Sequence, residues 1–540
     1  MDFLGIVQYE KSKPDRPSER IIRRLHKRAP DEIREALQPF GFYEPLIRPS
    51  LERTEQDWLA RYNVEPGTPV LLREVGIEVS GEGKAEPALG EVLANIDLAP
   101  DQQLDHRAYE DTKSRLLEVI YTAGYLDVRY ERSEIRVYPD QNSANIYLIL
   151  DTGPRYFFGQ VDIEQSILEP DFVRKYVTIK PGDPFDADKL IELQLSLTDS
   201  EYFSQVDVQV DRDNAENFRV PIKVTAQPSK RRRYIMGLGF GTDTGPRGNL
   251  GYKSRRLNRR GHHLRADLRL SAIKSTLSSQ YQIPIRNVRT DRATIFGNLE
   301  RAEVGDADTD RFSVGLSRDE GWLGFRRRLY TEVRREDFSF GDGPTQRTDL
   351  GILGGTLSRK VVDQLMFPTR GFSFSLDVHG AAEGVLSDTS FVQSVATGRV
   401  VRPLGTKGRL LLRGDVGSTI TESFDVLPPS ERFFTGGDRS VRGYSFESLS
   451  PRDAEGNNVG GDTLVVGSVE IDYLFKGNFG VAVFLDTGDA ANGVPDDLKT
   501  GAGIGLRYLS PIGMIRLDLA HPFDDPDEDF RFHISIGPDL

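Results

Sequence analysis

The pattern of apolar and polar residues changes near residue 229. Beyond this point, short segments alternate apolar with polar side chains, as in residues 372–378 (FSFSLDV), 515–519 (IRLDL) and 530–536 (FRFHISI). A period of two predicts β-strands with one apolar face and one polar face. A soluble β-sandwich would bury the apolar face, whereas a transmembrane barrel turns it toward lipid and keeps the charges in its lumen.

The connections between these segments favour the membrane barrel over the soluble all-β domain. Tight turns at residues 475–478 and 510–513 alternate with much longer links. Short turns on one side and long loops on the other are typical of outer-membrane barrels. Continued back to Tyr234, this spacing predicts an all-β transmembrane barrel of about 16 antiparallel strands over residues 229–540, with a long inward-folding loop over residues 421–463.

Residues 1–228 mix helical and strand patterns, and part of this mixture recurs at a spacing of roughly 80 residues. In the later copies, a strand-like run precedes two helix-like segments, an aromatic turn and a further strand. This order predicts α+β units of β-α-α-β-β topology, with two helices on one face of a small sheet. We place these units at residues 1–66, 67–153 and 154–228.

The first unit differs from the other two. It has a helical pattern at residues 31–37 but no clear first strand before it, so we expect this unit to be truncated at its N-terminus. The opening residues also lack the basic segment and the apolar run of a signal peptide.

Composition narrows the possible functions. The chain of 540 residues contains no cysteine, which rules out disulfides, thiolate catalysis and cysteine-ligated metals. Its net charge of −13 provides no basic field to attract nucleic acid. No G-x-S-x-G or H-E-x-x-H motif occurs, and the histidines show no metal-ligand spacing. We therefore expect no enzymatic activity, no cofactor, no metal site and no nucleic-acid partner.

A candidate functional motif, Val441-Arg442-Gly443-Tyr444, lies inside the longest loop. Alternation places Phe484 and Asp486 of a later strand in the lumen, and likewise Glu470 of the strand before it. Ordering a long loop is costly, so folding it into the lumen requires an anchor. The guanidinium of Arg442, bound in a bidentate manner by Asp486 and also by Glu470, would be a suitable anchor.

These segments resemble the V/I-R-G-F/Y lid motif and the F-x-D-x-G strand motif of the superfamily of outer-membrane barrel-assembly and two-partner secretion proteins. The repeated units resemble POTRA domains, and the run from Phe433 to Tyr444 is most similar to the TamA family of outer-membrane translocation and assembly subunits. The resemblance covers nearly the whole chain. It implies a barrel in the outer membrane, POTRA domains in the periplasm, and a lid whose Val441, Arg442, Gly443 and Tyr444 are held by Phe484, Asp486, Gly488 and Glu470.

The same resemblance implies a function. The protein would lie in the lipid bilayer, where it would assemble or insert outer-membrane proteins, autotransporters in particular. A TamB-like protein anchored in the inner membrane would bind the POTRA domains, and substrate strands would pair with an exposed sheet edge. The alternative is a two-partner secretion transporter that exports one dedicated exoprotein. Such transporters typically have two POTRA domains and a plug helix, whereas this sequence has parts of three units and no plug.

A barrel must close where its first strand meets its last. The first predicted strand has glycine at three successive lumen positions, Gly237, Gly239 and Gly241, and the last ends in Gly537-Pro538. Glycine offers no side chain to pack, and proline donates no hydrogen bond to a neighbouring strand. We therefore expect this seam to be the weakest junction and to open laterally. The alternative is that the glycines only make room for the lid.

Overall fold

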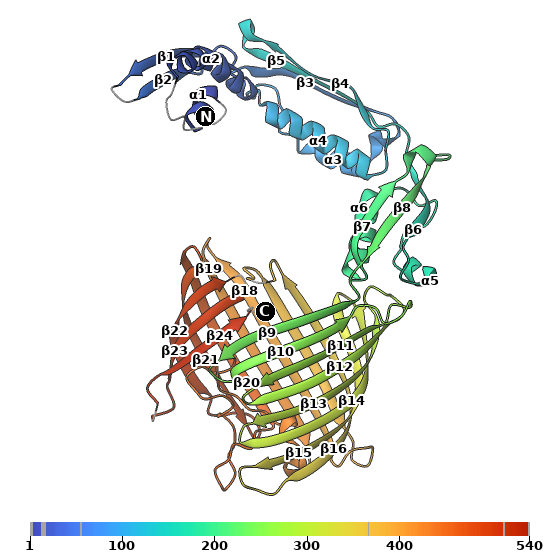
Figure 1. Cartoon of the computed structure of the whole chain (residues 1–540), viewed down its shortest axis with the longest axis vertical. Coiled ribbons are helices and arrows are strands. Elements are labelled where there is room, and N and C mark those ends of the chain that lie inside the picture. The colour runs from blue at the N-terminus through green and yellow to red at the C-terminus, as the bar shows by residue number, and fades with distance from the viewer. Residues whose placement is uncertain are drawn as a thin grey trace. The chain divides into compact units, whose positions relative to one another are not determined.

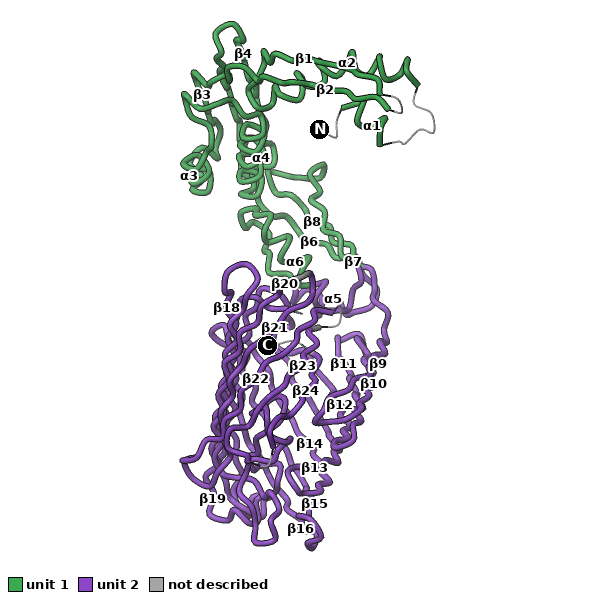
Figure 2. The backbone as a smooth tube through the Cα atoms, turned by 90° about the vertical axis from the view of Figure 1, so that its left-hand side faces the viewer, with its two compact units in different colours: residues 1–164, 177–196, 206–226 green, residues 165–176, 197–205, 227–540 purple. Residues whose placement is uncertain are grey.

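The structure, a computed structural model, describes residues 4–11, 18–54, 57–365, 367–510, 513–526 and 528–537. Internal contacts divide the chain into two compact units, which Figure 2 colours separately. The first comprises residues 1–164, 177–196 and 206–226, and the second comprises residues 165–176, 197–205 and 227–540.

Three small sheets with helices precede the barrel (Figure 1). Their elements are α1 (Gly5–Lys11), α2 (Glu19–Leu37), β1 (Leu46–Arg53), β2 (Trp58–Glu65), β3 (Leu71–Ser80), α3 (Pro87–Ala94), α4 (His106–Thr122), β4 (Arg129–Tyr138), β5 (Ser143–Asp151), β6 (Phe157–Glu164), α5 (Pro170–Arg174), α6 (Ala187–Asp199), β7 (Phe203–Val210) and β8 (Arg219–Pro228). The sheets β3-β5-β4 and β6-β8-β7 belong to units with the predicted β-α-α-β-β order.

A buried apolar core holds the helices α3 and α4, in the predicted unit at residues 67–153, to their sheet. Leu89 of α3 and Leu116 and Ile120 of α4 pack with Ile146 and Leu148 of β5. Along β5, buried and half-buried residues alternate, as expected for a strand with one face against helices.

The helix predicted at residues 31–37 is longer than the sequence pattern indicated. It is the end of α2, which begins at Glu19 and continues through Pro30. Proline removes one backbone donor from a helix, but Ile22 and Ile33 are buried on one face, and this packing stabilises the continuous helix.

Among the described residues, no strand precedes α2 and the first sheet contains only β1 and β2. No described helix is both long and apolar enough to cross a membrane.

The compact unit that includes residues 227–540 contains a 16-stranded antiparallel sheet, as predicted. Each strand pairs with the strands that are its neighbours in sequence. The sheet curls into a nearly closed barrel (Figure 1). Its strands are β9 (Arg232–Gly241), β10 (Gly245–Ser254), β11 (His263–Ser271), β12 (Lys274–Pro284), β13 (Arg292–Val304), β14 (Ala307–Trp322), β15 (Phe325–Phe340), β16 (Gln346–Val362), β17 (Gly371–Ala381), β18 (Phe391–Leu404), β19 (Gly408–Thr421), β20 (Thr463–Lys476), β21 (Phe479–Ala491), β22 (Lys499–Ser510), β23 (Gly513–Pro522) and β24 (Arg531–Gly537).

Side chains alternate between the two faces of the barrel wall. In β14, Phe312, Val314 and Leu316 are exposed on the outer face, whereas Ser313 and Ser317 are buried on the inner face. An apolar exterior and a polar interior are what a barrel surrounded by lipid requires.

The segment between β19 and β20, residues 422–462, is named the lid here. It is ordered by its own contacts: Phe433 forms an isolated β-bridge with Gly461. The buried side chain of Arg432 donates hydrogen bonds to the carbonyl oxygens of Leu427 at 2.8 Å and Val459 at 3.0 Å. These contacts within the lid help to define its shape.

Candidate functional site

The guanidinium of Arg442 in the lid lies among carboxylates from three barrel strands. Its Nε and Nη2 donate to the two oxygens of Asp486 on β21 at 2.6 and 3.0 Å, while Nη1 donates to Glu470 on β20 at 2.6 Å and to Asp518 on β23 at 3.2 Å. The ring of Phe484 lies below the guanidinium, 3.4 Å from Cζ to the ring centroid. We call Arg442 with Asp486, Glu470 and Asp518 the latch.

The latch is charged although it is buried. Asp486 is 0% exposed and Arg442 is 6% exposed. Burial alone would lower the pKa of Arg442, but the charges of Asp486 and Glu470 raise it above its ordinary value. Removing either partner would leave the other as an uncompensated buried charge.

A second arginine shares the carboxylates of the latch. Arg507 of β22 is 1% exposed and donates to Glu470 at 2.7 Å, to Asp518 at 2.5 Å and to Asp472 at 3.2 Å. Arg409 of β19 forms a further ion pair with Asp472. The latch is therefore one part of a charge network that joins β19 to β23 inside the barrel.

The other residues of the predicted motif hold the lid around Arg442. Val441 is fully buried and packs with Tyr444. Gly443 has a φ of 102°, which favours glycine, and donates its N–H to Nε2 of His533 on β24 at 3.0 Å. The hydroxyl of Tyr444 accepts the backbone N–H of Asp524 at 3.2 Å.

Two glycines allow the backbone to approach closely at this site. A Cβ at Gly501 of β22 would lie 1.9 Å from the carbonyl oxygen of Arg442. A Cβ at Gly488 of β21 would lie 2.6 Å from the carbonyl oxygen of Val465 on β20. Gly501 thus leaves the space that the lid occupies, and Gly488 permits the close approach of two strands.

The sequence analysis missed a second anchor, at the base of the lid. Glu431 is 3% exposed, and its carboxylate lies 2.8 Å from Nε2 of His379 on β17 and pairs with Arg334 on β15. Burial alone would raise the pKa of Glu431, but Arg334 and His379 lower it. These partners come from strands remote in sequence, so no local pattern indicated them. Asp518, Arg507 and His533 were missed for the same reason.

The lid contacts the last strand of the sheet and the turn that follows the first strand. On one side, Gly443 binds His533 of β24. On the other, the backbone N–H of Asp438 donates to Oδ2 of Asp243, in the turn after β9, at 2.7 Å. The pKa of Asp438 is raised to about 7 by burial and by the neighbouring charge of Asp243. The lid therefore bridges the seam at the end where β9 finishes.

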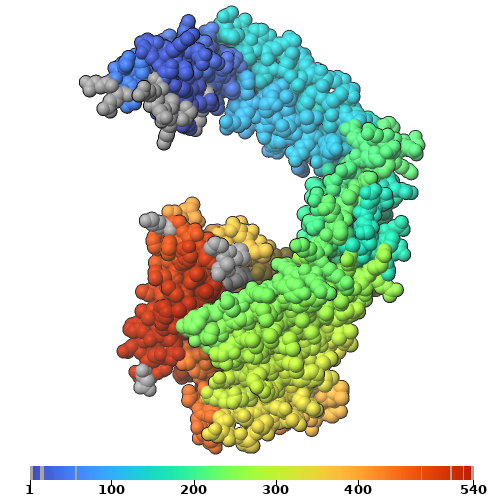
Figure 3. Space-filling view, viewed as in Figure 1, coloured from blue at the N-terminus to red at the C-terminus, as the bar shows by residue number. Residues whose placement is uncertain are grey.

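Strands β9 and β24 are the two ends of the sheet, and no ladder of backbone pairs joins them among the described residues. They lie side by side, as the first (green) and last (red) barrel strands in Figure 3 indicate. The backbone N–H of Ile534 donates to Oγ1 of Thr242 at 3.2 Å. Gly537 is the last described residue of β24, and Pro538, predicted as a seam residue, lies outside the described residues.

The predicted seam glycines make room for the neighbouring hairpin strand. A Cβ at Gly237 would lie 2.1 Å from Oδ1 of Asn249, and a Cβ at Gly239 would lie 2.9 Å from Nε of Arg247, both on β10. At Gly241 the nearest atom is Oγ1 of Thr244, at 3.2 Å. In each case the nearest atom belongs to the β9–β10 hairpin and not to the lid.

Among the described residues, no group of histidine and acidic side chains is arranged to hold a metal ion.

Family models match three parts of the chain. The Omp85 superfamily domain matches residues 236–539. A POTRA family described as TamA domain 1 matches residues 1–66, and a POTRA family described as surface antigen variable number repeat matches residues 156–227.

Two of the similar proteins are named outer membrane protein assembly factor BamA. The outer membrane protein assembly factor BamA of Nitratidesulfovibrio vulgaris is 25% identical over 532 residues, which cover 92% of this chain and 66% of the relative. BamA of Neisseria meningitidis is 22% identical over 488 residues, which cover 76% of this chain and 60% of the relative. This chain thus spans slightly less than two thirds of the length of these two relatives.

A solved structure has the same fold. The crystal structure of BamA from Haemophilus ducreyi lacking POTRA domains 1–3 has a TM-score of 0.71 at 15% identity, covering 86% of this chain and 99% of that one. The superfamily model matches more than half of the chain. The chain therefore belongs to the Omp85 superfamily, with its β-barrel in the outer membrane and its POTRA domains in the periplasm.

Proposed function

We propose that this protein assembles or inserts other proteins into the outer membrane, by offering a free strand edge at the seam to a strand of the substrate. The observation that carries the proposal is the absence of a backbone ladder between β9 and β24 among the described residues. An unpaired edge presents donors and acceptors with which another strand can pair. The relatives named as outer membrane protein assembly factors support the same role.

In this proposal the lid controls the seam. Arg442 holds the lid inside the lumen, and the lid contacts the turn after β9 through Asp438 and strand β24 through Gly443. Release of the lid would remove two of the contacts that bring β9 and β24 together. Seam opening would then require breaking few backbone hydrogen bonds, because the described residues of β9 and β24 form no ladder with each other.

We further assign the chain to the TamA-type assembly factors, which would act on autotransporters with a TamB-like partner bound to the POTRA domains. The match of residues 1–66 to a TamA-type POTRA family supports this finer assignment. Proteomics of outer membranes after deletion of the gene would test it. Selective loss of autotransporters is expected. Depletion of many barrel proteins would favour a BamA-like range, and loss of one secreted protein would favour two-partner secretion.

A disulfide across the seam tests the proposed mechanism. Because the chain has no cysteine, Thr242→Cys with Ile534→Cys introduces one possible disulfide, which joins the turn directly after β9 to β24 across the seam. We expect the oxidised variant in lipid vesicles to lose assembly activity and to recover it on reduction. The matched control is Asn298→Cys with Ser313→Cys on β13 and β14, whose native side chains are hydrogen bonded at 3.2 Å. Full activity with the seam crosslinked would contradict the proposal.

A further inference from the structure

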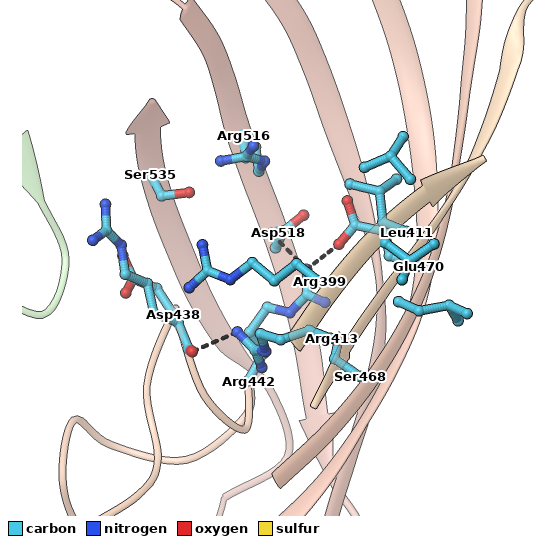
Figure 4. A pocket seen from close by; sticks show the side chains of 14 residues that line it. Arg399, Leu411, Arg413, Asp438, Arg442, Ser468, Glu470, Arg516, Asp518 and Ser535 are labelled. Atoms are coloured by element: carbon cyan, nitrogen blue, oxygen red, sulfur yellow. Dashed lines mark hydrogen bonds and ion pairs between the residues drawn. The ribbon is translucent and has the colours of Figure 1, made fainter. Parts of the chain in front are cut away.

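A cavity of about 300 Å³ lies inside the barrel beside the latch, lined by the lid and by β18, β19, β20, β23 and β24. Figure 4 shows its labelled side chains gathered over one part of the barrel wall. Arginine dominates its charged lining: Arg399, Arg413, Arg439, Arg442 and Arg516 face only Asp438, Glu470 and Asp518.

The carboxylates of this cavity are already occupied. Glu470 and Asp518 each bind both Arg442 and Arg507. The third carboxylate, Asp438, is half-buried beside Asp243, and its partial burial and the neighbouring charge raise its pKa to about 7. At neutral pH it therefore carries only part of a negative charge.

Two of the arginines are near a carboxylate but form no ion pair with it: Arg399 lies near Asp415, and Arg439 lies near Asp438. No hydrogen bond or ion pair joins the side chain of Arg399 or Arg439 to any other residue in the part of the chain that the structure describes. Arg399 is half-buried on β18, and Arg439 lies on the lid. Among the residues that line the cavity, arginines thus outnumber carboxylates.

A buried donor at the same cavity also lacks an acceptor. Arg413 of β19 donates through Nη1 and Nη2 to the lid carbonyl oxygens of Arg439 and Ser440. Its Nε forms an ion pair with Oδ2 of Asp415 at 3.8 Å, a distance too long for a hydrogen bond, and it has no hydrogen-bond partner among the described residues. A buried donor in this state is normally paired with a protein group, a water or a ligand.

We propose that this cavity binds a small oxyanion, a carboxylate or a phosphate group, between Arg399 of the barrel wall and Arg439 of the lid. Guanidinium groups bind such anions through paired, charge-assisted hydrogen bonds. The buried Nε of Arg413 supplies a further donor, whose attraction to an anion is screened less than in water. Because the two arginines belong to the wall and to the lid, a bound anion stabilises the inward position of the lid. The site binds its anion whether or not the chain assembles membrane proteins.

Two sources supply this chemistry: inorganic phosphate, and the terminal carboxylate of a polypeptide. Isothermal titration calorimetry on the full chain in nonionic detergent distinguishes them. The probes are inorganic phosphate, a short peptide with a free C-terminal carboxylate, and the same peptide with an amidated C-terminus. We expect saturable binding of phosphate, of the free peptide, or of both, no binding of the amidated peptide, and slower cleavage of the lid by protease when the anion is bound.

Variants locate the binding site. Arg439→Gln alters an exposed lid position, so the fold is retained, and it should weaken binding about tenfold. Arg399→Gln combined with Arg439→Gln should abolish saturable binding. The matched controls are Arg402→Gln, exposed on the same strand β18, and Arg452→Gln, exposed in the lid, and both should bind as the native chain does. Equal affinity in the native chain and the double variant, or saturable binding of neither phosphate nor free peptide, would overturn the proposal.

Discussion

The backbone N–H of Gly443 donates a 3.0 Å hydrogen bond to Nε2 of His533, and this bond attaches the lid directly to the last strand of the barrel. The residue before it, Arg442, binds carboxylates on β20, β21 and β23. Asp438, a few residues earlier, binds the turn after β9. The lid therefore contacts both sides of the seam, and changes that loosen it should be measurable there.

Arg442→Ala should release the lid without unfolding the barrel. The substitution leaves the fully buried Asp486 without its bidentate partner, so we expect the free energy of unfolding to fall by about 3–5 kcal/mol. Urea titration measures the stability, and limited proteolysis within the lid measures its release. Arg452→Ala, which removes an exposed lid arginine, is the control. If the lid of Arg442→Ala resists protease as well as the lid of Arg452→Ala and of the native chain, Arg442 is not the anchor.

Gly501→Ala should displace the lid without removing any charge. The added Cβ would lie 1.9 Å from the carbonyl oxygen of Arg442, a backbone atom that cannot rotate away. Gly467→Ala is a matched control, because its Cβ would lie 3.8 Å from the nearest atom, in ordinary contact. We expect faster protease cleavage of the lid in the first variant only. Similar cleavage rates in both would show that the lid does not rest on β22.

Glu431→Gln should loosen the base of the lid. The substitution removes the negative charge that faces Arg334 and His379 in a buried site. A double-mutant cycle with Arg334→Gln should give a coupling energy of about 0.5–3 kcal/mol from unfolding measurements. Glu422→Gln, exposed at the start of the lid, should show no coupling with Arg334→Gln. Additive effects of Glu431→Gln and Arg334→Gln would rule out this anchor.

The contact between the lid and the turn after β9 should weaken as the pH rises. The pKa of Asp438 is about 7 in the folded protein and near 4 in an unfolded chain, so the folded state binds this proton more tightly. The contribution of this proton to stability is therefore lost between about pH 4 and pH 7, as Asp438 becomes charged beside Asp243. We expect the melting temperature to fall more in the native chain than in Asp438→Asn across this range. Glu455→Gln, exposed in the lid, should behave as the native chain, and equal pH profiles for all three would refute the assignment.

The sequence by itself determined which residues face lipid and which face the lumen. Alternation is a local property of a strand, so Phe484 and Asp486 could be assigned to the inner face from their neighbours alone. The predicted strand number and the β-α-α-β-β order depend on the same local periodicity, and both agree with the structure. The course of α2 through Pro30 was not predictable, because burial of Ile22 and Ile33 outweighs the local signal to end the helix.

Only the tertiary structure decided which lumen residues meet. Many charged side chains share the same inward periodicity, and the pattern of the chain cannot rank Asp518 above any other carboxylate as a partner of Arg442. Contacts such as Gly443 with His533 join residues whose distance is set by the curvature and register of the whole barrel. The second anchor at Glu431 and the arginine-lined cavity arise in the same way, because each requires strands remote in sequence to be brought together around one ordered lid.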